Sequence, residues 1–218
     1  MDLLSMYLKG GVIMHPILLC SVIALAIIID RLIIIRRAKL NAPAFMIRIR
    51  GYLKKKDVEG AISFCLEEKS PTANMIRKGL KKYKHGHERV KEAIENAGKQ
   101  EIAKLEKGLS ALATIAGIAP MLGFLGTVTG MVSAFMTIQD LQGAASPCDL
   151  AGGIWEALIT TVFGLVVGIP ALAFYNYLLS RISRLVNDME VISTEIVDTI
   201  EEVNTGGSKM DEEIEIDL

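Results

Sequence analysis

The sequence predicts an all-α polytopic membrane protein with three transmembrane helices, of which the second and third extend into the cytoplasm as long amphipathic helices. Two observations predict this class. Three apolar segments of the 218-residue chain are each long enough to cross a membrane, which takes roughly 20 helical residues for about 30 Å of hydrocarbon. Charged residues make up 22% of the chain, yet these segments almost exclude them. The buried core of a soluble domain would supply one such segment, but hardly three.

The predicted elements, in chain order, are a short outer N-terminus (1–15), the first span (16–36), a cytoplasmic helical segment (37–108), the second span (109–138), a short outer loop (139–149), the third span (150–179), a cytoplasmic helix (180–205) and an acidic tail (206–218) that we expect to be disordered. The second span has no charged residue, and the third has one, Glu156.

The distribution of charge predicts how the chain crosses the membrane. Residues 36–107 contain 19 Lys and Arg against 9 Asp and Glu, whereas the loop 139–149 has no Lys or Arg. Basic segments stay on the cytoplasmic side, which predicts an outer N-terminus and a cytoplasmic C-terminus. Residues 188–218 contain 11 acidic residues and one lysine. This acidic end could pair with the basic segment of its own or a neighbouring copy, although a solvated tail is the simpler interpretation.

Helical periodicity continues beyond the second and third spans. After the third span, apolar residues recur at helical spacing: Ile182, Leu185, Val186, Met189, Ile192, Ile196, Ile200 and Val203. Before the second span, the same spacing joins Val90, Ile94, Ala97, Ile102, Leu105 and Leu109. Two long helices that pack on one another are therefore expected, with shorter helices before them that break near Pro43, Gly51 and Ser70-Pro71.

Small residues crowd the second and third spans, as in GFLGTVTGMVSAF at residues 123–135. Small side chains let helix backbones approach closely in lipid. The predicted helix-packing positions are Gly123, Gly126, Gly130, Gly164, Gly168, Pro120 and Pro170. On this interpretation, Thr127 and Thr161 merely donate hydrogen bonds to carbonyls four residues earlier in their own helices.

The two threonines also lie at matching depth, which suggests a second interpretation. Thr127 lies 11 residues before residue 138, and Thr161 lies 11 residues after residue 150. Because the two helices run in opposite directions, both hydroxyls are expected roughly 16 Å below the outer surface. An ion pathway between helices needs polar groups at that depth, and threonine offers a donor and an acceptor without a permanent charge. The residues alone leave both interpretations open.

Glu156 is the third candidate for a proton pathway. Carboxylates inside a membrane are costly and are functional candidates by default. The alternative is a partly hydrated side chain that reaches the outer surface, because Glu156 lies six residues after the predicted start of its span. On an ideal helix it points roughly 140° away from Thr161. No titratable group lies at the depth of the threonines, so a proton carrier would have to come from a partner or from linked waters.

Other classes of function lack the residues that they require. Cys20, Cys65 and Cys148 lie far apart and form no CxxC motif, which argues against a disulfide framework or a zinc site. The sequence contains no HExxH, GxSxG or P-loop motif, so we expect no enzyme, no metal and no cofactor. Three spans also provide no inverted repeat of the kind that builds secondary transporters.

The spans resemble a known family. LATIAGIAPMLGFLGTVTGMVSAF and GGIWEALITTVFGLVVGIPALAFYNYL are similar to the paired signature of the MotA/TolQ/ExbB proton-channel family, and GGVIMHPILLCSVIALAIIIDRL resembles ExbB/TolQ-type first spans. The segment SPTANMIRKGL matches within the cytoplasmic region. Three spans argue against the MotA branch, whose members have four.

The resemblance implies a bacterial inner-membrane motor subunit without enzymatic activity. Five subunits would surround a central pore that holds two copies of a single-span ExbD/TolR-like partner, whose aspartate carries the proton. The family's pore threonines fall on Thr127 and Thr161, and its glutamate falls on Glu156. Proton flow would pass work to envelope proteins such as a TonB/TolA-like protein. An ExbB-like role in outer-membrane transport is favoured by length; a TolQ-like role in envelope integrity and a non-conducting scaffold are the alternatives. The choice between H⁺ and Na⁺ is open.

Overall fold

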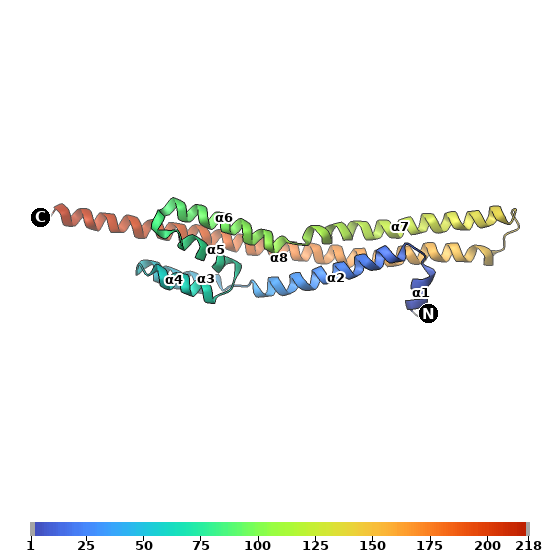
Figure 1. Cartoon of the computed structure of the whole chain (residues 1–218), viewed down its shortest axis with the longest axis horizontal. Coiled ribbons are helices and arrows are strands. Elements are labelled where there is room, and N and C mark those ends of the chain that lie inside the picture. The colour runs from blue at the N-terminus through green and yellow to red at the C-terminus, as the bar shows by residue number, and fades with distance from the viewer. Residues whose placement is uncertain (1–2, 217–218) are drawn as a thin grey trace. The chain divides into compact units, whose positions relative to one another are not determined.

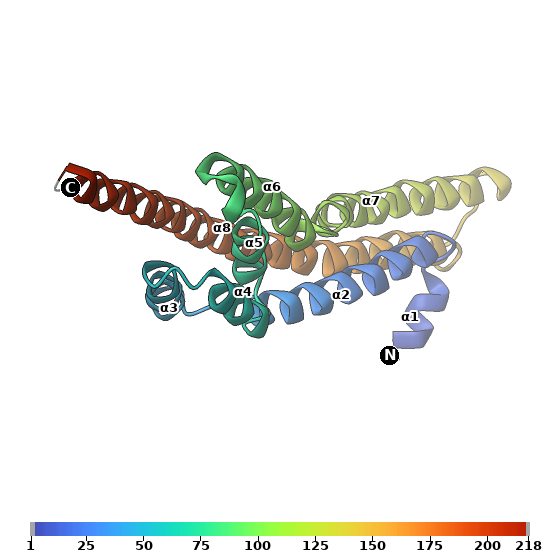
Figure 2. The same ribbon diagram turned by 60° about the vertical axis from the view of Figure 1, so that its left-hand side comes forward.

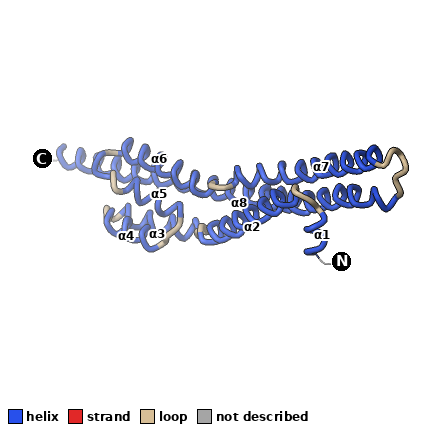
Figure 3. The backbone as a smooth tube through the Cα atoms, turned by 45° about the vertical axis from the view of Figure 1, so that its right-hand side comes forward, coloured by secondary structure: helices blue, strands red, loops and turns tan. Residues whose placement is uncertain are grey.

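The computed structural model describes the backbone of residues 3–216 and the side chains of residues 5–7 and 9–203. The described residues form helices and loops without a strand (Figure 3). The helices are α1 (Leu3–Lys9), α2 (Met14–Arg37), α3 (Ala42–Lys54), α4 (Val58–Glu67), α5 (Pro71–Leu80), η1 (Tyr83–His85), α6 (His87–Glu106), α7 (Leu109–Asp140) and α8 (Pro147–Ile216). The chain divides into an apolar unit, Met1–Leu32 with Gly108–Leu179, and a polar unit, Ile33–Lys107 with Ser180–Leu218.

In the described part of the chain, three helices are long and apolar enough to cross a membrane, as the sequence predicts. In the apolar unit, α7 and the first part of α8 run antiparallel, joined by a short loop, and α2 lies beside α8 (Figures 1 and 2). The outward faces of these helices carry large apolar side chains, among them Leu18, Phe124 and Leu158. Such faces suit a lipid environment, in which no hydrophobic effect drives helices together.

The polar unit is a small helical core built by consecutive helices. α3 packs on α4, α4 on α5, and α5 on α6. Phe45 and Phe64 stack with ring centroids 5.6 Å apart. A Cβ atom added at Gly79 of α5 would come within 2.9 Å of the Ile94 side chain of α6, so α5 and α6 approach closely only because residue 79 lacks a side chain.

The cytoplasmic helix predicted after the third span is present as the continuation of α8. Ile182, Met189, Ile192, Ile196 and Ile200 are all buried, in agreement with their helical spacing. The bounds of α8 include residues 206–216 of the predicted acidic tail. Side chains beyond Val203 lie outside the described residues, and disorder of that tail stays a prediction.

The continuation before the second span is not one helix. α6 ends at Glu106 and α7 begins at Leu109, because Gly108 has a left-handed backbone conformation with φ of 83°. Left-handed glycines commonly end helices. The amphipathic helix predicted before the second span is therefore present as α6, separated from α7 by a short break at Lys107-Gly108.

Two of the three breaks predicted in the preceding region coincide with helix starts. Pro43 lies in the first turn of α3, and Ser70 caps α5 by accepting a hydrogen bond from the Ala73 N–H at 3.1 Å. The predicted break at Gly51 is wrong, since α3 continues through it to Lys54. The turn that follows instead contains Lys56, which has φ of 56°.

Candidate ion pathway between helices α7 and α8

Glycine residues set the distance between α7 and α8. A Cβ atom at Gly123 would lie 2.9 Å from the Thr160 carbonyl oxygen, and one at Gly164 would lie 2.7 Å from the Ala119 carbonyl oxygen. A Cβ atom at Gly130 would lie 2.6 Å from the Gly153 carbonyl oxygen. These neighbours are backbone atoms that cannot rotate away, so the two helices pack backbone against backbone.

The other predicted packing positions are placed as follows. Gly126 packs against the side chain of Thr160, and Gly168 packs against the ring of Pro120, whose Cδ would lie 2.6 Å from an added Cβ. Pro170 is exposed on α8. The sequence interpretation missed Gly153, although it extends the small-residue spacing of residues 157, 164 and 168 by one further turn.

Thr161 joins the two helices by a hydrogen bond. Its hydroxyl donates to the Gly123 carbonyl oxygen of α7 at 3.0 Å and lies 3.3 Å from the Ala157 carbonyl oxygen of its own helix. The hydroxyl of Thr127 donates to the Phe124 carbonyl oxygen at 2.6 Å. Both side chains are half-buried. Each threonine thus satisfies its donor on a carbonyl, while its oxygen can still accept. The packing interpretation expected carbonyls four residues earlier, whereas Thr127 bonds three residues back and Thr161 bonds mainly across to α7.

The two threonines border the same side of the α7–α8 pair. On ideal helices, Thr127 and Thr161 are each displaced by roughly 50–60° from the centre of the glycine face, in the same rotational sense. In an antiparallel pair, displacements of the same sense fall on the same side. Gly126 and Thr160 are displaced in the opposite sense, and they touch each other. That contact supports the geometry, which gives this side two hydroxyls, with Thr161 level with Gly123 and Thr127 about one turn further along α7.

Thr160 is a buried hydroxyl that the sequence interpretation did not single out. Its side chain is fully buried, and its hydroxyl lies 2.9 Å from the carbonyl oxygens of both Glu156 and Ala157. A threonine that bonds only to its own helix and fills the space over Gly126 is a packing residue. The sequence alone could not show that Thr160 is the packing residue and Thr161 the pathway candidate, because only their contacts in the structure differ.

Glu156 lies on the opposite side from Thr127 and Thr161. Its carboxylate packs over Gly11, in the turn between α1 and α2, so that a Cβ atom at Gly11 would lie 2.8 Å from Glu156 Cδ. Gly11 has φ of 67°, which glycine adopts readily. The same turn reaches α8 at Ile159, 3.4 Å from a Cβ atom added at Gly10. The structure therefore brings Thr127 and Thr161 to one side and separates Glu156 from them.

The described residues hold no group of three or more His, Cys, Asp or Glu arranged to bind a metal. The described part of α7 has no ionisable residue before Asp140. A proton that crossed at the level of the threonines would therefore need a carrier from outside this chain.

The apolar unit therefore contains a pair of membrane-length helices held together by glycines, with two threonine hydroxyls on one side of the pair. The sequence profile of the MotA/TolQ/ExbB proton channel family matches residues 67–191. The chain belongs to this family, and it is a multi-pass inner-membrane protein.

Several named proteins are similar over most of the chain. Tol-Pal system protein TolQ of Haemophilus influenzae is 31% identical over 213 residues, which covers 86% of this chain and 89% of that protein. Biopolymer transport protein ExbB of Neisseria meningitidis is 28% identical over 193 residues, covering 82% and 86%. A biopolymer transport protein ExbB homologue of Methanothermobacter thermautotrophicus is 29% identical over 190 residues, covering 87% and 67%.

Proposed function

We propose that this chain is an ExbB-like subunit of a motor driven by the proton-motive force. With an ExbD/TolR-like single-span partner it would form a proton channel that energises outer-membrane transport through a TonB/TolA-like protein. The proposed assembly is a homopentamer around a partner dimer, with the N-terminus periplasmic and the C-terminus cytoplasmic. The observation that carries the proposal is the pair of hydroxyls, Thr127 and Thr161, within about one helical turn of each other on one side of α7–α8.

The proposed mechanism uses both properties of a hydroxyl. A protonated carboxyl group of the partner would donate to a threonine oxygen, while the threonine hydroxyl keeps donating to the carbonyl of Gly123 (Thr161) or Phe124 (Thr127). When the carboxyl group loses its proton, the hydroxyl would rotate and donate to the carboxylate instead. A bare charge in hydrocarbon is very costly, and hydrogen bonds to charged groups are the stronger ones. The threonines would thereby lower the cost of the charged state during transfer.

Proton flux into liposomes tests this proposal. We expect flux only when chain and partner are reconstituted together, and we expect Thr127→Val with Thr161→Val to lower it at least tenfold, because valine keeps the shape and removes the hydroxyl. Thr161→Ser should restore most of the flux at that position. Thr129→Val is the matched control, since Thr129 lies two residues from Thr127, is exposed and bonds only to its own helix.

Unchanged flux in the double valine variant, with assembly intact, would reduce the threonines to packing residues. The proposal would then fail in favour of a proton pathway through Glu156. Absence of flux when chain and partner are reconstituted together would instead favour a non-conducting scaffold.

A TolQ-like role is the second candidate, because the TolQ relative matches this chain as well as the ExbB relatives do. Complementation of bacteria that lack each subunit separates the two. Rescue of outer-membrane uptake alone would support the ExbB-like role. Rescue of detergent resistance alone would support the TolQ-like role.

A further inference from the structure

A hollow in the apolar unit lies beside the turn that joins α1 to α2. It has a volume of about 440 Å³, and its lining residues are Lys9, Ala151, Gly152 and Trp155. A Cβ atom added at Gly152 would meet nothing within 4 Å. The hollow therefore exists because two of its lining residues are small, and it lies within the first turns of α8.

The wall of this hollow combines a cation with an aromatic ring. The Lys9 ammonium group lies 5.6 Å from the centre of the Trp155 ring, within the range of a cation–π contact. Among the described residues that line the hollow, Lys9 is the only charged one, because the nearby carboxylate of Glu156 packs over Gly11 instead. The indole N–H is buried and has no hydrogen-bond partner among the described residues. The described lining offers positive charge and no acceptor carboxylate.

An apolar stripe leads away from the hollow along α8. Leu158 and Val162 follow Ala151 and Trp155 at spacings of three and four residues, and their side chains are 60% and 51% exposed. On a helix such residues share one face. The stripe runs from the hollow toward the middle of the third span, where an acyl chain would lie.

We propose that this hollow binds the headgroup of an anionic phospholipid. The phosphate would lie against the Lys9 ammonium group, and one acyl chain would lie on Leu158 and Val162. Lysine and tryptophan are typical of the membrane–water interface, and basic pockets between membrane helices bind anionic headgroups. The proposal rests on the membrane location of the apolar unit and does not depend on proton conduction.

Trp155 provides a direct probe, since it is the only tryptophan in the chain. The full chain would be reconstituted into phosphatidylcholine vesicles that carry, at one mole fraction, either brominated phosphatidylglycerol or brominated phosphatidylcholine. We expect the brominated anionic lipid to quench Trp155 more strongly than the brominated neutral lipid. The attraction of one lysine near a membrane surface should enrich the anionic lipid at the hollow roughly fivefold.

Two variants test the site from different directions. Lys9→Gln removes the cation and should bring the two brominated lipids to equal quenching. Gly152→Leu fills the hollow without touching Lys9 and should do the same. Lys39→Gln is the control, because it removes one positive charge from an exposed position in the polar unit. Circular dichroism confirms that each variant keeps its helices.

Equal quenching by both lipids in the unmodified chain would overturn the proposal. It would also be overturned if neither lipid quenched Trp155, because a second copy of the chain or a protein partner would then cover the hollow.

Discussion

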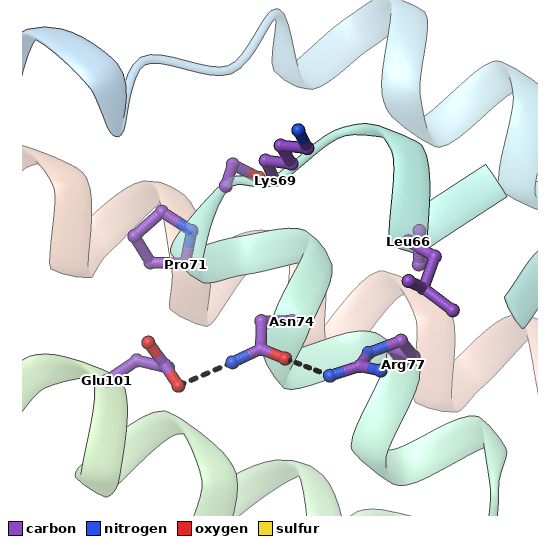
Figure 4. A pocket seen from close by; sticks show the side chains of 8 residues that line it. Leu66, Lys69, Pro71, Asn74, Arg77 and Glu101 are labelled. Atoms are coloured by element: carbon purple, nitrogen blue, oxygen red, sulfur yellow. Dashed lines mark hydrogen bonds between the residues drawn. The ribbon is translucent and has the colours of Figure 1, made fainter. Parts of the chain in front are cut away.

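Glu101 is a charged residue buried in the core of the polar unit. Helical periodicity predicted that its neighbour, Ile102, would be buried there instead. The spacing of apolar residues predicted Ile102 on the buried face of α6, whereas Ile102 is half-buried and Glu101 is 6% exposed. The carboxylate accepts hydrogen bonds from Asn74 at 2.6 Å and Lys104 at 2.8 Å. Figure 4 shows the hydrogen bond from Asn74 to Glu101 and a second one that Arg77 donates to the Asn74 side-chain oxygen at 2.6 Å. A buried carboxylate is tolerated here because donors surround it.

Removal of this carboxylate should destabilise the polar unit. We expect Glu101→Ala to lower the free energy of unfolding by about 1–3 kcal/mol, because the Asn74 amide and the Lys104 ammonium group lose their acceptor. Glu106→Ala, at an exposed position near the end of the same helix, is the matched control. Urea unfolding of the full chain in detergent, followed by circular dichroism, measures the difference. Equal unfolding midpoints for the two variants would show that the Glu101 carboxylate adds nothing to the stability of the polar unit.

Cys65 should be far less reactive than an exposed thiol. Burial raises the pKa of the Cys65 thiol to about 12, although the positive charge of Arg77 opposes the shift. The thiolate is the reactive form, and a raised pKa keeps it scarce until the pH approaches that value. We expect maleimide at neutral pH to modify Cys148, which is exposed, well before Cys65. Mass spectrometry of peptides after timed labelling checks the order, and comparable rates at both positions would contradict it.

At the scale of elements, the close α7–α8 contact can be tested by comparing two glycine-to-alanine variants within α7. Gly123→Ala places a Cβ atom 2.9 Å from one backbone atom of α8 and 3.1 Å from another. Overpacking of this kind costs about 1–3 kcal/mol. Gly117→Ala meets nothing within 4 Å in the same helix, and alanine favours a helix by up to about 1 kcal/mol over glycine. In thermal unfolding in detergent, Gly123→Ala should therefore lower the Tm and Gly117→Ala should raise it. A shift of the same sign and size in both would refute the close contact.

Sequence patterns predicted the long elements better than their interruptions. Length and hydropathy gave the three spans, and the spacing of isoleucines gave the buried face of α8 beyond Leu179. Glycine was ambiguous: Gly51 continues a helix, whereas Gly108 separates two. A glycine breaks a helix only where the tertiary structure requires a left-handed residue, and no local pattern states that requirement.

Residue counting predicted the depth of the candidate site only approximately. Counting from the ends of two antiparallel spans placed Thr127 and Thr161 at one level, whereas the hydrogen bond from Thr161 to the Gly123 carbonyl places Thr161 about one turn from Thr127. Ideal helix geometry also separated Glu156 from Thr161. The partners of these residues were beyond the sequence, because the Gly123 carbonyl and the turn at Gly11 lie far from them along the chain. Thr160 and Thr161 are identical neighbours, and only tertiary contacts distinguish them.

At the scale of the whole molecule, the charge asymmetry predicts which side of the membrane each loop faces. The α7–α8 loop contains no lysine or arginine, while residues 36–107 are strongly basic. In this loop Ser146 donates to Asp149 from its N–H at 2.9 Å and from its hydroxyl at 2.7 Å. These hydrogen bonds lower the pKa of Asp149, so this carboxylate stays ionised at any pH near neutrality. A negatively charged loop without basic residues gives no reason for retention on the cytoplasmic side.

Orientation can be measured with Cys148, which lies at the start of α8 beside this loop. In a variant with Cys20→Ala and Cys65→Ala, an impermeant maleimide added to cells with a permeabilised outer membrane should modify Cys148 without lysis. A matched variant that moves the single exposed cysteine to position 55, Lys55→Cys with all native cysteines removed, should react only after the inner membrane is opened. The reverse pattern would invert the topology. It would also place the basic segment outside, against the rule that basic loops stay in the cytoplasm. The depth argument for Thr127 and Thr161 would survive such an inversion, since it depends only on the antiparallel pairing of α7 and α8.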